Sequence, residues 1–279
     1  RRNLELTETI RTQEKRGSLL WVLDQTKTAM GKRLLRKYLE QPLANIPQIT
    51  RRQAAVAELF DKNIDRVELA EALSGVYDLQ RLMTKVVYGT VNPREMQSLS
   101  FTASHLPQVK ALTQTFSSAL LRDLDAQLDT LSDIRELIDS AIVEDPPVSL
   151  KDGGVIKKGY NADLDELKDI HTNAKGYLAD IEQREKELTG IKNLRISYNR
   201  VFGYFIEVTK SNLNLVPDRY IRKQTLVNCE RYITEELKEL ESKVLYATDK
   251  MVGLETGLYN DIPKTLSDKL SVIERTASA

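Results

Sequence analysis

Ile191 to Lys210 reads Ile-Lys-Asn-Leu-Arg-Ile-Ser-Tyr-Asn-Arg-Val-Phe-Gly-Tyr-Phe-Ile-Glu-Val-Thr-Lys. In this stretch β-branched and aromatic residues alternate with polar ones, a pattern that is typical of β-strands. Asn199 to Gly203 lie where a hairpin would turn. The stretch therefore predicts a strand, a short loop and a second strand in a chain that otherwise favours helices.

Apolar residues with helical spacing flank the predicted hairpin on both sides. One such pattern covers 161–188, and a second covers 229–258, where apolar residues recur every three or four positions. At about 1.5 Å per residue, each predicted helix is roughly 42 Å long. We expect the two helices to run antiparallel and to carry the hairpin at the end of an arm. A connector over 217–223 follows the hairpin, and Asn228 begins the return helix.

Positive charge is concentrated around the hairpin. The whole chain has a formal net charge of +0, whereas residues 191–231 carry eight basic and three acidic side chains. A basic tip on acidic helices is expected of an arm that holds a polyanion. Ser197, Asn199 and Gly203 lie among the cations and offer short donors and close backbone approach to phosphate. The alternative is that these charges are ordinary solvated groups on an exposed sheet.

The N-terminal 60 residues are basic and predict three helices. Ser18 and Thr28 are suitable N-caps for helices over 18–24 and 28–40, and Asn45 with Pro47 starts a third that ends at Phe60. Their helical spacing places several large apolar side chains in the core, namely Trp21, Leu34, Leu35, Tyr38 and Leu39.

The middle of the chain is acidic and predicts further helices. We expect one helix over 67–86, a second that begins after Asn92-Pro93 and ends at Leu106-Pro107, and a third over 120–142. Asp145-Pro146-Pro147 marks a domain boundary, followed by short strands around 155–156. Residues 1–145 with 228–279 are then a discontinuous helical domain, into which 146–227 are inserted.

Several kinds of chemistry find no support in the sequence. The chain lacks a phosphate-binding loop, so nucleotide hydrolysis is not assigned to it. His105 and His171 have no neighbours at zinc-ligand spacing. The single cysteine, Cys229, has no partner for an internal disulfide, which suits a reducing compartment. No apolar run is long enough for a membrane span. Because the chain opens without methionine, we expect it to be a piece of a longer protein.

Several separate motifs resemble the MutS family of DNA mismatch-repair proteins, and they occur in the family's order along essentially the whole chain. They are Arg2-Asn3-Leu4-Glu5-Leu6, Gly17-Ser18-Leu19-Leu20-Trp21-Val22-Leu23-Asp24, Thr28-Ala29-Met30-Gly31-Lys32-Arg33-Leu34-Leu35, Asp78-Leu79-Gln80-Arg81-Leu82, Asn199 to Tyr204 and Arg222-Lys223-Gln224-Thr225-Leu226.

The resemblance implies a mainly α fold, with a discontinuous helical lever domain and an inserted clamp domain that contains a small β-sheet. It also implies a cytoplasmic protein that forms homodimers, closes two clamps around double-stranded DNA and interacts with other mismatch-repair proteins. ATP with Mg²⁺ would bind at a separate C-terminal domain of the intact protein. This chain itself is expected to be no enzyme and to hold no cofactor or metal.

Transferred by position, the resemblance implies DNA-backbone contacts from Arg195, Ser197, Asn199, Arg200 and Lys210. The family's N-terminal mismatch-reading domain has no counterpart in the sequence. Phe205-Ile206-Glu207 spells the family's Phe-x-Glu reading motif but falls in a predicted clamp strand, so we interpret it as coincidence. A rival hypothesis remains, in which the arm is a structural coiled coil whose β tip docks another protein.

Overall fold

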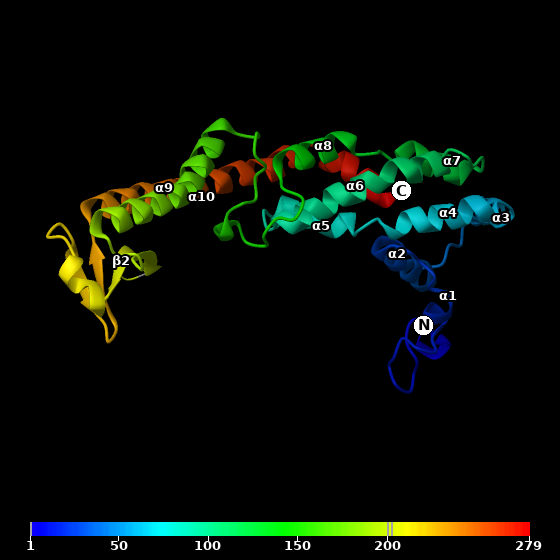
Figure 1. Ribbon diagram of the computed structural model, residues 1–279. Helices are drawn as coiled ribbons and strands as arrows, with labels where there is room; N and C mark the ends of the chain where they lie inside the picture. The colour runs from blue at the N-terminus through cyan, green and yellow to red at the C-terminus, as the bar shows by residue number, and fades with distance from the viewer. Residues whose placement is uncertain (1, 200, 202) are drawn as a thin grey trace. The chain divides into compact units, whose positions relative to one another are not determined.

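The computed structural model describes residues 2–199, 201 and 203–279, and within them the chain is mainly helical with one four-stranded antiparallel sheet (Figure 1). The mainly α fold with a small β-sheet is therefore confirmed. The α-helices are α1 (Leu19–Leu23), α2 (Ala29–Glu40), α3 (Ile46–Asp61), α4 (Asn63–Ser74), α5 (Leu79–Val87), α6 (Pro93–Thr113), α7 (Ala119–Gln127), α8 (Ser132–Ala141), α9 (Ala162–Thr189), α10 (Glu235–Ser267) and α11 (Leu270–Ser278). The strands are β1 (Arg195–Asn199), β2 (Gly203–Thr209), β3 (Ile221–Thr225) and β4 (Cys229–Ile233), and the 3-10 helices are η1 (Arg2–Leu4), η2 (Leu150–Asp152) and η3 (Lys210–Leu215).

The chain divides into two compact units. Unit 1 contains residues 1–150, 154–157 and 258–279, and unit 2 contains 151–153 and 158–257. The lever and clamp boundaries inferred from the sequence describe a different, functional division, and they stay a prediction.

Unit 1 is built around α6, which contacts α4, α5, α7 and α8 (Figure 1). Leu106 and Val109 are both buried on this helix, on either side of Pro107. The prediction that Leu106-Pro107 ends the helix is therefore wrong. A proline removes one backbone donor and strains the preceding turn. In α6 the packed faces before and after Pro107 outweigh that local cost.

The predicted helix starts near the N-terminus are confirmed by their caps. Ser18 Oγ accepts the Trp21 N–H at 3.2 Å, and Thr28 Oγ1 accepts the Gly31 N–H at 2.9 Å. Asn45 Oδ1 accepts the Gln48 N–H at 3.1 Å. Each cap satisfies a donor that the first helical turn leaves without a partner.

The prediction that the large apolar side chains of these first helices lie in the core is wrong. Trp21 is 50% exposed, Leu34 is 44% exposed and Tyr38 is 37% exposed. None of the residues of α2 is buried. Helical spacing shows which side chains share a face, but it does not show whether another element covers that face.

Two long helical predictions are each interrupted in the structure. Residues 67–86 form parts of α4 and α5, because Asp78 caps a new helix by accepting the Arg81 N–H at 3.2 Å. Residues 120–142 form α7 and α8, separated at Leu131, whose φ of 52° is left-handed. The strands expected near 155–156 reduce to one isolated bridge between Ile142 and Ile156.

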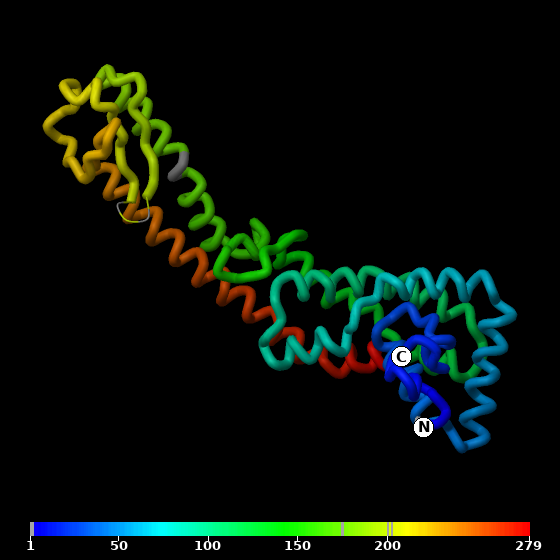
Figure 2. Tube along the Cα trace, turned by 90° about the horizontal axis from the view of Figure 1, so that it is seen from below, coloured from blue at the N-terminus to red at the C-terminus, as the bar shows by residue number. Residues whose placement is uncertain are grey.

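In unit 2, α9 and α10 lie side by side and run antiparallel, as predicted (Figure 2). Lys168 Nζ lies 3.3 Å from Glu255, whereas Arg184 Nη2, further along α9, lies 2.5 Å from Glu236, further back on α10. The ion pairs therefore connect ascending positions on one helix to descending positions on the other. The long-arm prediction is confirmed for this unit.

The prediction that the return helix starts at Asn228 is wrong. Residues 229–233 form β4, which pairs with both β2 and β3, and α10 begins only at Glu235. Cys229 is therefore on a strand. Ile233 matches the apolar spacing of the helix but continues the strand's own buried pattern, so spacing alone placed it in the wrong element. Likewise, β3 begins at Ile221, inside the predicted connector.

The sheet has the strand order β1-β2-β4-β3, and one of its faces packs on α9 and the start of α10. The buried cluster there combines residues from the helices, the strands and the connecting loops: Ile181, Ile191, Leu194, Ile206, Val208, Tyr220, Tyr232 and Leu237. This core fixes the hairpin on the helices and so positions the residues discussed next.

Candidate nucleic-acid interface

The hairpin predicted from the sequence is present, with β1 as an edge strand paired to β2. Arg195, Ser197 and Asn199 alternate along β1 and therefore share one face of the sheet. Arg195 and Ser197 are exposed, and Asn199 is half-buried. At about 3.3 Å per residue, the three side chains span roughly 13 Å along the strand.

Asn199 stabilises the turn that follows it. Its side-chain oxygen accepts the Val201 N–H at 2.8 Å, which closes a short Asx-type turn. An amide group has a separate NH₂ donor. No described residue accepts a hydrogen bond from that donor, so it can bind an anion. Arg200, the next predicted contact, lies outside the described residues.

Apart from Arg200, which lies outside the described residues, the basic side chains of 191–231 fall into two groups. The first is engaged with carboxylates: Arg219 with Glu185 at 2.5 Å, Arg231 with Glu207 at 3.2 Å and Arg222 with Glu230 at 3.5 Å. The second has no ion-pair partner among the described residues and is exposed: Lys192, Arg195, Lys210 and Lys223. The second group is the one available to an incoming polyanion.

Three of the unpaired cations lie at the same end of the hairpin, opposite the turn. Lys192 and Arg195 flank the beginning of β1, and Lys210 follows the end of β2. Asn193 Nδ2 donates to Thr209 Oγ1 at 3.0 Å, which ties the two segments together. Lys192 is an addition to the residues expected from the family resemblance. The concentration of basic residues over 191–231 is the sequence signal that includes it.

Glu207 lies opposite Arg195 in the sheet, and its charge is neutralised by a neighbouring arginine. It lies opposite both Arg195 and Arg231 in register, but among the described residues only the Arg231 guanidinium forms an ion pair with it. Arg231 also lies over the Phe205 ring at 4.3 Å from its centroid, which fixes its orientation. Arg195 is therefore left without a partner on its own sheet face.

Glu182 of α9 supports β1 from beneath. Burial acts to raise the pKa of this carboxyl, but the Ile196 N–H, the Lys186 ammonium and the charge of Arg195 together hold the pKa below its usual value. Its Oε2 accepts the Ile196 N–H at 2.9 Å. Glu182 therefore remains ionised and holds the edge strand on the helix.

The residues that spell the Phe-x-Glu motif are poor candidates for reading a base. Phe205 and Ile206 are buried within β2, and the Glu207 carboxylate is engaged by Arg231. The predicted placement of this motif in a strand is confirmed.

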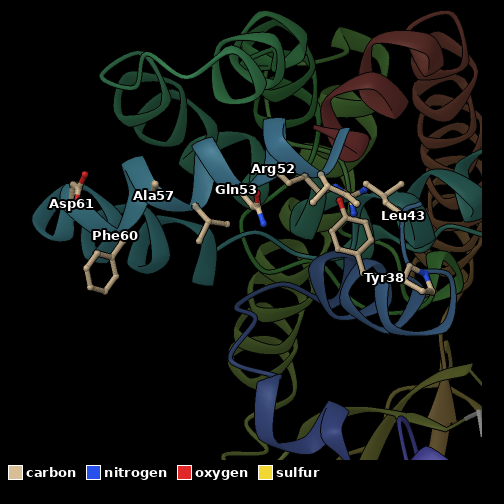
Figure 3. Close-up of a pocket in the computed structure, with 10 residues that line it drawn as sticks. Tyr38, Leu43, Arg52, Gln53, Ala57, Phe60 and Asp61 are labelled. Carbon is tan, nitrogen blue, oxygen red and sulfur yellow. The ribbon is translucent and has the colours of Figure 1, made fainter. Parts of the chain in front are cut away.

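Unit 1 contains a separate apolar groove on α2 and α3. Its lining includes Leu43, Val56 and Phe60, and Arg52 lies 3.7 Å from the centroid of the Tyr38 ring (Figure 3). Figure 3 shows Tyr38 beside Arg52 and Phe60 projecting from the far part of α3. The lining holds no pair of groups arranged for acid–base or nucleophilic chemistry.

Neither a metal-binding cluster nor a membrane-spanning helix is present in the described part of the chain. Within the described part of the chain, no group of three or more His, Cys, Asp or Glu side chains could hold a metal ion. Among the described helices, none is both long and apolar enough to cross a membrane.

The whole chain matches a known protein family. Residues 1–279 match the family described as MutS domain III. The chain belongs to that family. Its resemblance to MutS, inferred from motifs, is thereby confirmed.

Individual MutS relatives agree with this assignment. The DNA mismatch repair protein MutS of Alkaliphilus oremlandii is 52% identical over 279 residues, which are 100% of this chain and 32% of that protein. MutS of Lachnoclostridium phytofermentans is 50% identical over 279 residues, 100% of this chain and 30% of its own length. MutS of Clostridium botulinum is 47% identical over 278 residues, 99% of this chain and 30% of its length. The chain thus spans about a third of the length of these MutS proteins.

Proposed function

We propose that this chain is the clamp and lever part of a MutS mismatch-repair protein and that it binds duplex DNA through the sugar–phosphate backbone. The observation that carries the proposal is the group of exposed, unpaired cations on the β1–β2 hairpin, with Arg195 and Lys210 among them. Phosphate contacts of this kind position a protein on DNA and carry no base information.

In this proposal the contacts have different physical roles. Arg195 and Lys210 neutralise phosphate charge, while Ser197 and the Asn199 NH₂ group donate neutral hydrogen bonds. The long helices α9 and α10 act as the arm that carries the hairpin. Arg200 is a further proposed contact, on the family resemblance alone.

The remaining activities of a MutS protein are proposed to lie outside this chain. It lacks a phosphate-binding loop, so ATP and Mg²⁺ would act elsewhere in the intact protein, and the chain itself would be non-enzymatic. The intact protein is proposed to form a homodimer and to work with other mismatch-repair proteins in the cytoplasm. The rival function, docking of a protein by the β tip, predicts no salt-dependent affinity for DNA.

Replacing Arg195 with alanine should weaken binding to every duplex alike. If Arg195 neutralises one phosphate, the slope of log K against log salt concentration should flatten by about 0.9, because one fewer counterion is released. Titrations of a fluorescent duplex at several salt concentrations measure this slope. Arg135→Ala is the matched control, since it makes the same charge change at an exposed arginine of unit 1 that pairs with Asp139. An unchanged slope for Arg195→Ala would remove the hairpin from the DNA contact and favour the basic N-terminal 60 residues.

Matched and mismatched duplexes should bind with equal affinity. The proposed contacts all reach the backbone, and the one motif that spells a mismatch reader is buried in β2. Competition between a matched duplex and the same duplex with a single mispair gives the ratio directly. A preference above about tenfold, which corresponds to about 1.4 kcal/mol, would contradict binding through the backbone alone.

A further inference from the structure

Glu241 of α10 contacts Gly203 and Tyr204 at the start of β2, beyond the end of the β2–β4 ladder. We infer that Glu241 is a positioning residue for the end of the β1–β2 hairpin at Asn199 and Gly203, and this inference rests on the proposed function. Its carboxylate acts on the hairpin backbone, which in turn places the donors that meet phosphate.

The first contact is a hydrogen bond from the Tyr204 N–H of β2, which lies beyond the β2–β4 ladder. β4 begins its pairing with β2 at Ile206, so Tyr204 lies past the last paired residue on that side. Its N–H donates instead to Glu241 Oε2 at 3.3 Å. Strand donors that lack a partner cost free energy when they are withdrawn from water, so this contact holds β2 on α10.

The second contact is steric and lies at Gly203. Gly203 has a φ of +73°, and a Cβ added there would lie 2.0 Å from Glu241 Oε1. The carboxylate therefore lies directly against the glycine backbone. Any larger residue would displace Glu241, in addition to the strain that a left-handed φ imposes on an ordinary residue.

These contacts connect Glu241 to a proposed phosphate donor. Gly203 is the register partner of Asn199, the last pair before the turn. Asn199 in turn accepts the Val201 N–H through its side-chain oxygen. Glu241 is thus connected through Gly203 to Asn199, whose NH₂ group is the proposed phosphate donor.

The negative charge of Glu241 distinguishes a positioning role from a direct electrostatic effect on DNA. A carboxylate repels phosphate, so if Glu241 affected binding only through its charge, its removal should tighten binding. If it positions the turn, its removal should weaken binding, because the Asn199 donor loses its fixed place. The two possibilities predict opposite changes in affinity.

The test compares three variants of the chain. Glu241→Ala should weaken duplex affinity by about fivefold, the equivalent of about one neutral hydrogen bond, and should leave the salt slope unchanged. Glu241→Gln keeps an acceptor for the Tyr204 N–H and should restore most of the affinity. Glu239→Ala is the matched control, because it removes an exposed carboxylate two residues away on the same helix.

Amide hydrogen exchange at Tyr204 provides a readout that does not require DNA. Exchange should be faster in Glu241→Ala than in the unaltered chain, and it should be unchanged in Glu239→Ala. Unchanged Tyr204 exchange in Glu241→Ala, or duplex affinity equal to that of Glu239→Ala, would overturn the inference. Failure of the unaltered chain to bind duplex would instead overturn the proposed function, so the two failures are distinguished.

Discussion

Replacing Ile206 with alanine should lower the free energy of unfolding of unit 2 by about 4 kcal/mol. Ile206 is 0% exposed at the centre of β2, and its register partners are Ile196 and Tyr232. The cost combines the lost burial of apolar surface with the cavity left between the sheet and Leu237 of α10. Because marginal stability is the rule for single domains, a loss of this size would leave a large fraction of unit 2 unfolded under mild denaturant.

The only cysteine of the chain is a reporter for this unit. Cys229 is half-buried in β4, and burial raises the pKa of its thiol, so we expect its labelling to become faster when the sheet opens in urea. Ile221→Ala is the matched control, because it makes the same substitution at a residue of β3 that is 48% exposed. It should cost about 1 kcal/mol or less. Coincident labelling midpoints for the two variants would contradict the packing of Ile206.

Replacing Glu185 with alanine should lower the free energy of unfolding by about 3 kcal/mol. Glu185 is 3% exposed on α9, where Oε2 accepts the Tyr220 O–H at 2.8 Å and the Arg219 guanidinium at 2.5 Å. Burial, together with the Glu185 carboxylate, raises the pKa of Tyr220, so its hydroxyl stays protonated as a donor. Removal of the carboxylate leaves that buried hydroxyl without an acceptor and frees the segment before β3.

A double variant separates the lost hydrogen bonds from a simple loss of volume. Glu185→Leu with Tyr220→Phe removes both polar groups and fills the space, so it should recover much of the stability that Glu185→Ala loses. Urea titrations of the single and double variants give the coupling free energy. If the loss of stability in the double variant equals the sum of the losses in Glu185→Leu and Tyr220→Phe, the carboxylate and the hydroxyl do not act as a pair.

Local chemistry accounts for the parts of the fold that sequence predicts well. The caps at Ser18, Thr28 and Asn45 and the alternation over 195–209 depend on neighbouring residues, and all are present as predicted. The prediction of a helix over residues 229–233 is wrong, because these residues form a strand only by pairing with β2 and β3, which lie outside this segment. The predicted helix end at Leu106-Pro107 is wrong for the same reason, since tertiary packing on α6 outweighs the local signal of the proline.

The candidate site was predictable in its location and less so in its composition. Local charge identified the hairpin, and Arg195 proves to be exposed and unpaired. Sequence could not separate it from Arg231 or Arg219, because the carboxylates that engage those two come from β2 and α9. Glu241 carried no local signal either, since its role depends on its contact with Gly203 and Tyr204.

An open sheet edge offers unpaired donors and acceptors to any other strand, and both edges of this sheet are obstructed. Along β1, the Ile196 N–H is already taken by Glu182. Along β3, the register shifts between Arg222 and Gln224, and the exposed Lys223 lies within the irregularity. Bulges and lysines on edge strands disfavour strand-to-strand aggregation. Edge-to-edge joining of the sheets of two copies of this chain is therefore disfavoured.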